Sequence, residues 1–439
     1  MTNARGIEKY SLPYAILKKY VDICFTLFYK IRIRGRENVN IKDVLIFAPN
    51  HQNALMDALA MLQVFKYQPV FLGRSDLFKS KTVTGILNFL KILPVYRIRD
   101  GYGELQKNDA TFIKTIEVLE NRRSLCIFPE GSHGIKKQLR PLKKGIARIA
   151  MQAMESTDSA LNIKIVPVGL YYQDHHRRAS HLFIQLGEPF EAGPYLQIFK
   201  DNPAKAYTML LDELRQRMKG EMLQIEKDEI NDTVEMLIVI YDALGRGQQI
   251  GSYAIFATQK RVIAVAENMY DNDRERYNML ASVSAELADF LRQGRIKAAD
   301  IALLQQGQTH FAAFAKGVLL MIGAPLFLYS YIQNLIPHLI VGRLKKLPKD
   351  PQFVSSVNFV GGIVLYPLFY IIQAVVITLV TESLQLGLAC LAILPLTWFF
   401  RNLWIEHFSM LRKVLQLRKH TNIIKILIDK ILQLTDIRY

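Results

Sequence analysis

Apolar and polar residues alternate in short runs over the first two thirds of the chain, up to about residue 308. Short β-type runs predict strands, and stretches with helical periodicity predict helices between them. The predicted strands are Val44–Ala48, Pro69–Leu72, Leu93–Arg97, Ser124–Phe128, Lys164–Val168 and Leu182–Leu186, and the predicted helices include Ala54–Val64, Asp109–Asn121 and Gly145–Met154. Because strands alternate with helices, we expect an α/β fold in which flanking helices cover a central, mostly parallel sheet.

Residues 203–308 have the pattern of amphipathic helices, and three long apolar stretches follow them. They are Gly317–Gly342, which has no Asp, Glu, Lys or Arg, Asn358–Val380, which is uncharged for 23 residues, and Leu384–Phe400, which is uncharged for 17. A membrane-spanning helix needs about 20 apolar residues, so the second stretch qualifies clearly and the third marginally. A large soluble core is the alternative, but three such runs so close together favour C-terminal transmembrane helical hairpins.

Basic residues follow the first and third apolar stretches and predict the orientation of the chain in the membrane. They are Arg343, Lys345, Lys346 and Lys349 after the first, and Arg401, Arg412, Lys413, Arg418 and Lys419 after the third. The positive-inside rule places both groups in the cytoplasm. Pro325 and Pro337 interrupt the first stretch, and a hairpin there would keep residues 1–316 on the cytoplasmic side. We therefore expect an integral membrane protein whose α/β domain faces the cytoplasm.

Two further segments have the composition of helices that lie on a membrane surface. Residues 14–29 are aromatic and apolar but contain Lys18, Lys19 and Asp22, which predicts an interfacial helix, although an ordinary core helix fits the same pattern. The tail after residue 404 alternates apolar and basic residues at helical spacing. The expected organisation is an interfacial helix at 1–30, an α/β domain at 31–200, a helical region at 201–310, membrane hairpins at 311–404 and a basic amphipathic tail at 405–439.

The charge of the chain indicates an anionic partner. Lys and Arg number 56 against 39 Asp and Glu, which gives a formal charge of +17, and half of the residues are hydrophobic. Nucleic acid and an acidic membrane surface are the two candidates, and the sequence has no recognisable nucleic-acid-binding module. Three distant cysteines, Cys24, Cys126 and Cys390, form neither a disulfide framework nor a metal-binding pair, and the N-terminus has no signal-peptide pattern. Both observations favour a cytosol-facing protein.

The first candidate for chemistry is a histidine at the end of a predicted strand, within Ala48–Asp57 (APNHQNALMD). A histidine with a pKa near neutrality suits a general base acting on an alcohol, and a carboxylate can fix its tautomer and stabilise the imidazolium. If both residues lay in one helix, six positions would rotate Asp57 by about 240° from His51, and the two side chains would not share a face. For the pair to meet, His51 must therefore lie in the turn before the helix. Taken alone, this pair is more typical of a structural histidine than of a catalytic one.

A second candidate is the loop Cys126–Gly134 (CIFPEGSHG), which follows another predicted strand. Its glycines let backbone N–H groups approach an anion, and Glu130 adds a carboxylate. Eight basic residues and one acidic residue lie between Arg122 and Arg148, which is typical of a solvated basic face or of a phosphate-binding edge. Leu93–Asp100 and Ile165–Gly169 are two further strand ends.

In their order along the chain, these four segments resemble the sequence blocks of the glycerolipid acyltransferases that act on lysophosphatidate and glycerol 3-phosphate. Asn50–Asp57 resembles the catalytic histidine–aspartate block, Pro94–Arg97 the second block, Phe128–Gly131 (FPEG) the third, and Val166–Val168 the fourth. The resemblance covers about residues 30–190. It implies catalytic roles for His51 and Asp57, and it implies that the acceptor is bound by Arg97, Glu130, Gly131, Ser132, His133 and Lys143.

Two departures from the family pattern resemble the branch that includes the fungal-type glycerol-3-phosphate acyltransferases. Five residues separate His51 from Asp57 where the family usually has four, and Ser132-His133 stands where the third block usually has Thr-Arg. The arginine that would contact the acceptor phosphate is therefore missing from this block. A nearby cation is expected to contact the phosphate instead: Lys136, Lys137, Arg140 or Lys143.

The resemblance implies a membrane-bound O-acyltransferase of phospholipid biosynthesis. It would move a fatty acyl chain from a thioester, acyl-CoA or acyl carrier protein, to a hydroxyl of 1-acyl-sn-glycerol 3-phosphate, with glycerol 3-phosphate or another lysolipid as the alternative acceptor. No cofactor or metal is expected, since neither nucleotide-binding glycine motif occurs and the histidines near residue 175 lack further ligands at metal-site spacing. From another class of protein, a non-enzymatic membrane protein that binds anionic lipids is the alternative.

Overall fold

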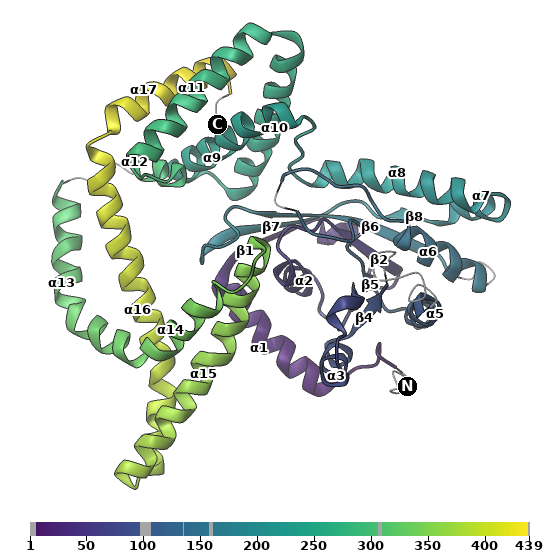
Figure 1. Ribbon diagram of the computed structural model, residues 1–439, viewed down its shortest axis with the longest axis horizontal. Coiled ribbons are helices and arrows are strands. Elements are labelled where there is room, and N and C mark those ends of the chain that lie inside the picture. Colours follow the sequence, from purple (N-terminus) through teal and green to yellow (C-terminus); the bar gives the residue numbers. More distant parts are fainter. Residues whose placement is uncertain (1–5, 97–106, 135, 158–160, 306–309, 438–439) are drawn as a thin grey trace. The chain divides into compact units, whose positions relative to one another are not determined.

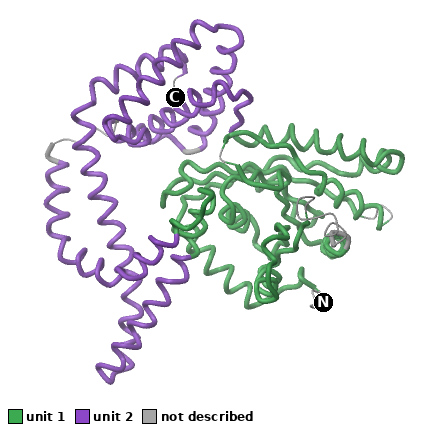
Figure 2. The backbone as a smooth tube through the Cα atoms, viewed as in Figure 1, with its two compact units in different colours: residues 1–222, 345–360 green, residues 223–344, 361–439 purple. Residues whose placement is uncertain are grey.

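The computed structural model of the chain describes residues 6–96, 107–134, 136–157, 161–305 and 310–437. The chain forms two compact units, which Figure 2 shows in different colours. Unit 1 consists of residues 1–222 and 345–360, and unit 2 consists of residues 223–344 and 361–439. The sequence pattern placed residues 345–360 among the membrane hairpins, and in the structure they pack as part of unit 1.

Unit 1 is built on a sheet with the strand order β1-β7-β6-β2-β5-β3-β4, and β8 also pairs with β6 (Figure 1). The strands are β1 (Tyr29–Arg34), β2 (Val44–Pro49), β3 (Val70–Arg74), β4 (Ile92–Val95), β5 (Leu125–Cys126), β6 (Ile163–Tyr172), β7 (Ser180–Leu186) and β8 (Phe190–Glu191). Among the described strands, only β6–β7 and β6–β8 are antiparallel pairs. The prediction of a mostly parallel sheet is therefore confirmed.

Helices cover both faces of this sheet. They are α1 (Leu12–Phe28), α2 (Leu55–Leu62), α3 (Lys81–Phe89), α5 (Lys107–Glu120), α6 (Gly145–Ser156), α7 (Leu196–Asp201) and α8 (Pro203–Glu221), with short 3-10 turns η1 (Arg36–Asn38), η2 (Ser75–Leu77), η4 (Gly193–Tyr195) and η7 (Pro351–Phe353). Val44, Ile46 and Ala48 of β2 point to one face, where they share an apolar cluster with residues of α6 and α8. Phe47 points to the opposite face, and its ring centre lies 4.7 Å from that of Phe65. All of β2 is buried, as expected of a central strand covered on both faces.

The N-terminal helix leads directly into an edge strand that the sequence pattern did not predict. Ser11 caps α1, the helix ends at Phe28, and β1 then pairs in parallel with β7. Along α1, Tyr14 and Phe25 are buried, whereas Ile16 is 64% exposed and Ile23 49%. One side of α1 therefore packs on unit 1 and another leaves large apolar side chains uncovered, so a position at a membrane interface stays a prediction.

Unit 2 is helical throughout its described residues. Its helices are α9 (Asn231–Gly247), α10 (Ser252–Asn272), α11 (Arg274–Gln293), α12 (Ala302–Gln305), α13 (His310–Gln333), α14 (Leu335–Leu344), α15 (Val354–Thr381, of which residues 354–360 belong to unit 1), α16 (Leu384–Arg418) and α17 (Thr421–Thr435), with the 3-10 turns η5 (Asp228–Ile230) and η6 (Ala298–Ile301). Within the unit, α9 packs against α10, α11 against α17, and α13 against α16. The Phe327 and Trp404 rings stack at 4.0 Å in the α13–α16 contact.

Within the described part of the chain, three helices are long and apolar enough to cross a membrane, judged by length and composition: Ala312–Gln333, Pro351–Thr381 and Leu384–Arg418. The first predicted apolar stretch is divided at Asn334, where α13 ends and α14 begins. The Asn334 side chain is fully buried, donates to Thr397 Oγ1 at 2.8 Å and accepts from the Tyr370 hydroxyl at 2.6 Å. A buried amide with these partners is satisfied in an apolar setting, which explains how a polar residue is accommodated between two apolar helices.

A glycine that follows β1 offers a test of the fold of unit 1. Gly35 has a φ of +77°, and a Cβ added there would lie 1.9 Å from the Leu186 carbonyl oxygen. We expect Gly35→Ala to lower the free energy of unfolding by roughly 2–3 kcal/mol. Gly85→Ala is the matched control, because Gly85 lies inside α3 with nothing within 4 Å of an added Cβ. That change should raise stability by about 1 kcal/mol.

Denaturant unfolding of the detergent-solubilised protein measures both changes. Equal changes in the free energy of unfolding for the two alanine variants would contradict the packing described for Gly35.

Candidate active site

His51 and the loop after Cys126 meet at one edge of the sheet because they follow neighbouring parallel strands. His51 comes two residues after the end of β2, and the loop Phe128–Gly134 follows β5. β2 and β5 pair in parallel, so their carboxyl ends lie side by side. The carboxyl edge of a parallel sheet is where open α/β folds place their sites. A backbone bond from Gly134 N–H to the His51 carbonyl, at 3.1 Å, ties the two segments together.

Asp57 fixes the orientation of the His51 ring. His51 Nδ1 lies 2.8 Å from Asp57 Oδ2, and the same oxygen accepts from the backbone N–H groups of Gln52 and Asn53 at 2.7 Å each. Asp57 lies in the first turn of α2 and is fully buried, whereas the His51 side chain is 16% exposed. When Nδ1–H donates to the carboxylate, Nε2 carries the lone pair and can accept a proton. The arrangement therefore suits His51 to general-base work.

Glu130 and Arg140 hold the loop Phe128–Gly134 against the end of β2. Glu130 Oε1 accepts from the His51 backbone N–H at 2.7 Å, and Oε2 accepts from Arg140 Nε at 2.9 Å. Arg140 also donates to Ser132 Oγ at 3.0 Å, to the His133 carbonyl at 2.5 Å and to the Ser132 carbonyl. Burial raises the pKa of Glu130, and the charge of Arg140 opposes that rise. Both carboxylate oxygens of Glu130 thus accept hydrogen bonds from the protein, one from His51 and one from Arg140. A direct contact of this carboxylate with substrate stays a prediction.

Gly131 lets the loop turn under a lysine side chain. Gly131 has a φ of +66°, and an added Cβ would lie 3.1 Å from Lys143 Cγ. The Lys143 backbone N–H donates to the Pro129 carbonyl at 2.7 Å, so the loop and the start of the next segment are held together. An exposed lysine therefore lies directly beside the loop that follows β5, where an ammonium group can attract an anionic substrate.

Aromatic rings enclose His51 on the side of this loop. The Phe128 ring stacks on His51 with 4.2 Å between ring centres, and the His133 ring meets His51 edge-on at 5.4 Å. On its far side His133 contacts the Phe353 ring at 4.9 Å, and its Nε2 lies 3.3 Å from Asp350 Oδ2. Burial is the largest cause that lowers the pKa of His133, and Asp350 acts in the opposite direction. Asp350 and Phe353 belong to unit 1, so these contacts are all within one unit.

The predicted site residues that the structure describes therefore lie together at this edge: His51, Asp57, Glu130, Gly131, Ser132, His133 and Lys143. Arg97 lies outside the described residues. Sequence reasoning missed Arg140 as the partner of Glu130, and it missed Asp350 and Phe353, which are more than 200 residues away in sequence. It also missed Arg74, which ends β3 and whose charge contributes to lowering the pKa of His133. Arg74 could have been predicted as a site residue from its position at the end of β3, a strand that pairs with β5.

A buried polar cluster lies behind Asp57. The Tyr172 ring is 5.3 Å from Tyr29 and 5.1 Å from His175, and the Tyr29 hydroxyl donates to the His175 carbonyl. Burial raises the pKa of Tyr172 well above its ordinary value and lowers the pKa of His175 to about 4. Both side chains are therefore neutral at physiological pH, and the charge of Asp57 acts on both of them. Searched over the described residues only, the chain has no group of three or more His, Cys, Asp and Glu that could hold a metal ion.

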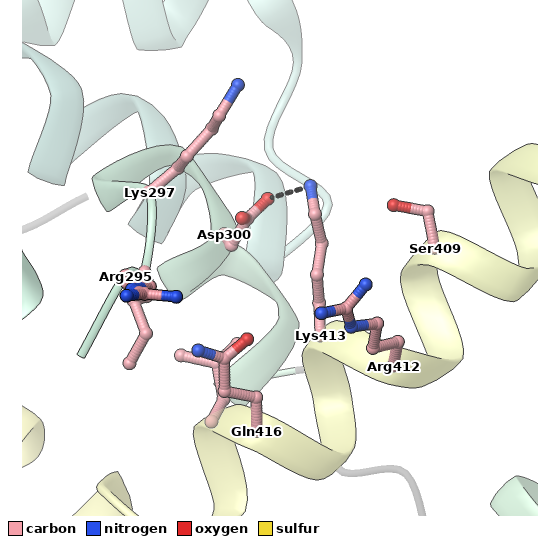
Figure 3. Close-up of a pocket in the computed structure, with 9 residues that line it drawn as sticks. Arg295, Lys297, Asp300, Ser409, Arg412, Lys413 and Gln416 are labelled. Atoms are coloured by element: carbon pink, nitrogen blue, oxygen red, sulfur yellow. Dashed lines mark hydrogen bonds and ion pairs between the residues drawn. The ribbon is translucent and has the colours of Figure 1, made fainter.

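A separate pocket of about 240 Å³ lies within unit 2 (Figure 3). Its charged lining residues are Arg295, Lys297, Asp300, Arg412 and Lys413, and Asp300 accepts from Lys413 Nζ at 2.9 Å. Four cations against one carboxylate make this pocket basic. It lies on the segment before η6 and on the last part of α16, and the residues predicted for acyl transfer are all in unit 1.

Comparison with known proteins identifies the domain that carries this site. A family model described as Acyltransferase matches residues 30–171, which include β2, α2, β5 and the loop Phe128–Gly134. We call this matched segment, residues 30–171, the acyltransferase domain after the family to which it is similar. The segment includes both His51 and Asp57, together with the loop that contacts them.

Individual proteins are similar to part of this chain. Glycerol-3-phosphate O-acyltransferase 2 of Saccharomyces cerevisiae is 31% identical over 114 residues, which cover 26% of this chain and 15% of the yeast protein. A 1-acyl-sn-glycerol-3-phosphate acyltransferase of Borreliella burgdorferi is 30% identical over 142 residues, which cover 32% of this chain and 51% of the bacterial protein. The matches thus span about half or less of the length of these relatives.

A solved structure, the 1-acyl-sn-glycerophosphate acyltransferase of Thermotoga maritima, is also similar, with 20% sequence identity and a TM-score of 0.34. The match covers 47% of this chain and 77% of that one.

The ion pair inside the acyltransferase domain predicts a stability effect. Arg140→Gln removes the cation beside a Glu130 side chain that is only 4% exposed, so we expect the free energy of unfolding to fall by about 2 kcal/mol. Lys144→Gln is the control, because Lys144 is an exposed cation close by in sequence. Denaturant titration distinguishes the two, and equal stability of both variants would contradict the role assigned to Arg140.

The lowered pKa of His175 predicts a pH-dependent effect. In the unfolded chain this imidazole takes up a proton near pH 6.5, whereas in the folded state it does so near pH 4. The unfolded state therefore binds more protons between these values, and stability falls as the pH falls from about 6.5 towards 4, by up to about 3 kcal/mol. His175→Gln should remove this part of the pH dependence. Melting temperatures of both proteins between pH 7 and 4.5 measure it, and parallel curves would rule out a buried, neutral His175.

Proposed function

We propose that the chain is a membrane-bound glycerolipid O-acyltransferase that moves a fatty acyl chain from an acyl thioester to a hydroxyl of 1-acyl-sn-glycerol 3-phosphate. The observation that carries the proposal is the His51–Asp57 pair, with 2.8 Å between Nδ1 and Oδ2, at the edge of a matched acyltransferase domain. The yeast relative is a glycerol-3-phosphate acyltransferase and the bacterial one a 1-acyl-sn-glycerol-3-phosphate acyltransferase, which supports a phosphorylated glycerol acceptor.

The reaction follows from the position of the His51 ring. Nε2 takes the proton of the acceptor hydroxyl while the hydroxyl oxygen attacks the thioester carbonyl. The tetrahedral intermediate then collapses and the C–S bond breaks. Nε2 passes its proton to the leaving thiolate, which departs as the free thiol. Asp57 stabilises the imidazolium that exists between these two proton transfers. General-base help contributes about 10²–10⁴ in rate, so the positioning of the two substrates supplies much of the remainder.

Direct transfer requires no covalent acyl-enzyme, and the side chains near the site support this. Burial raises the pKa of the Cys126 thiol well above its ordinary value, which disfavours the nucleophilic thiolate. Ser132 Oγ accepts a hydrogen bond from Arg140, a cation that cannot take the hydroxyl proton as a general base would. Acyl-CoA and acyl carrier protein are both suitable donors, and no cofactor takes part in the proposed reaction.

A membrane location agrees with the chemistry of the substrates. The three candidate spans provide the anchor, and the basic residues that follow α14 and lie in the last part of α16 favour a cytoplasmic acyltransferase domain. The candidate span Pro351–Thr381 has 31 residues, about ten more than a bilayer requires, and its first ten residues belong to unit 1. A site beside the start of a span would meet lysolipid and acyl chains at the bilayer surface.

Glycerol 3-phosphate is the second candidate acceptor. It is favoured by the five residues between His51 and Asp57, by Ser132-His133 in the third block, and by the similarity to the yeast glycerol-3-phosphate acyltransferases. A panel containing both acceptors and both thioester donors decides between these activities.

The test of the proposed function is transfer of a labelled acyl group by the purified full chain in mixed micelles. We expect His51→Ala to lower turnover by about 10²–10⁴ and Asp57→Asn to lower it by at least about tenfold, because the base or its orientation is lost. His407→Ala, an exposed histidine of α16, should keep wild-type turnover.

Wild-type transfer by His51→Ala would remove His51 as the base. A wild-type protein that binds anionic vesicles but acylates no acceptor of the panel would favour the non-enzymatic lipid-binding alternative.

A further inference from the structure

Residues 345–360 connect two apolar helices in sequence but belong to the unit that contains the acyltransferase domain (Figure 2). They follow α14, include η7, and run into the first turns of α15. The helix then continues to Thr381 as part of the candidate span Pro351–Thr381. A segment outside the matched residues 30–171 is therefore part of the same compact unit.

This segment contacts the loop beside His51 through one histidine. Asp350 Oδ2 lies 3.3 Å from His133 Nε2, and the Phe353 ring meets the His133 ring edge-on at 4.9 Å and 89°. The other side of the His133 ring contacts His51 at 5.4 Å and 83°. His133 is thus held between the general base and residues 350–353, and its side chain is only 7% exposed.

Two further contacts fix the segment in place. Ser355 Oγ donates to the His175 carbonyl at 2.8 Å and lies 2.9 Å from His176 Nδ1. The Phe359 ring packs edge-on against Phe25 at 5.7 Å and Phe28 at 5.6 Å, near the end of α1. Ser355 and Phe359 are buried. The segment is therefore anchored directly after its contact with the site, which gives that contact a fixed support.

We propose that Asp350 and Phe353 are positioning residues of the acyltransferase site, which hold the His133 imidazole against His51 and so keep the base in its productive orientation. This inference rests on the proposed function. His51 is held on its Nδ1 side by Asp57 and on one ring face by Phe128, and His133 supplies the edge contact. Loss of either support of His133 frees a ring that touches the base, and small displacements of catalytic groups have large rate effects.

The same contact changes how the acceptor phosphate is bound. His133 stands where the family pattern places an arginine that contacts this phosphate, and here its Nε2 faces the Asp350 carboxylate instead. A carboxylate beside a phosphate would repel it, so the phosphate does not lie at His133 Nε2. Residue 133 serves in this chain as a link between the site and the segment that begins α15.

The experiment measures kcat, both KM values and the melting temperature of the full chain in mixed micelles, with the acceptor that the wild type uses. We expect Phe353→Ala and Asp350→Ala each to lower kcat by about tenfold, with the KM of the acyl donor within about twofold of wild type and an unchanged melting temperature. Phe353→Tyr keeps the ring and Asp350→Asn keeps an accepting oxygen, so both should restore most of kcat. Lys349→Ala, an exposed neighbour of Asp350, is the control and should match wild type.

A double-mutant cycle tests whether the effect passes through His133. In a His133→Ala background, Asp350→Ala should cause no further loss of kcat. Alanine variants that keep full kcat, losses that parallel a fall in melting temperature, or additive losses in the cycle would each overturn the inference while leaving the proposed function intact. A wild-type protein that acylates no acceptor would overturn the proposed function, and this inference with it.

Discussion

One buried oxygen organises the whole site. Asp57 Oδ2 accepts from the His51 ring and from two consecutive backbone N–H groups, those of Gln52 and Asn53. The two backbone bonds hold the chain between β2 and α2 in a tight turn, and the bond to the ring orients the imidazole. A single carboxylate thus connects backbone geometry to chemistry, because the turn that places His51 at the sheet edge is the turn that frees its Nε2.

The rest of unit 1 supports this turn from three sides. β5 brings the loop with Glu130 beside His51, and the Glu130 carboxylate accepts from the His51 backbone N–H. Arg140 holds the loop in shape, and Phe128 stacks on the ring. Behind Asp57, burial keeps His175 and Tyr172 neutral, so that no cation of this cluster competes with His51 for the carboxylate. The acyltransferase domain therefore holds the His51 ring by packing as well as by hydrogen bonds.

Periodicity predicted the parts of this structure that local patterns determine. The strands β2, β3, β4 and β6 lie where apolar runs were found, and the spacing of His51 and Asp57 required a turn before α2. β1 was missed because its sequence, YKIRIR, continues an aromatic, apolar run that has a helical pattern. The packing of Asp350 and Phe353 against His133 was not predicted, because nothing in the composition of residues 345–360 reveals it. Contacts between residues some 200 positions apart arise from tertiary folding, and no local period reports them.

The excess of basic residues has more than one location, which fits a membrane protein with an anionic substrate better than a nucleic-acid-binding protein. Lys143 lies beside the site loop, and further cations line the pocket of unit 2.

The central claim is that His51 acts as a base and that the acyl group passes directly from thioester to acceptor. The most direct measurement is a single-turnover reaction with a labelled acyl thioester, in which label on the acceptor and label on the protein are followed together. The account predicts labelled product with no protein-bound label at any time, and protein-bound label that passes to the acceptor at the rate of product formation would contradict it.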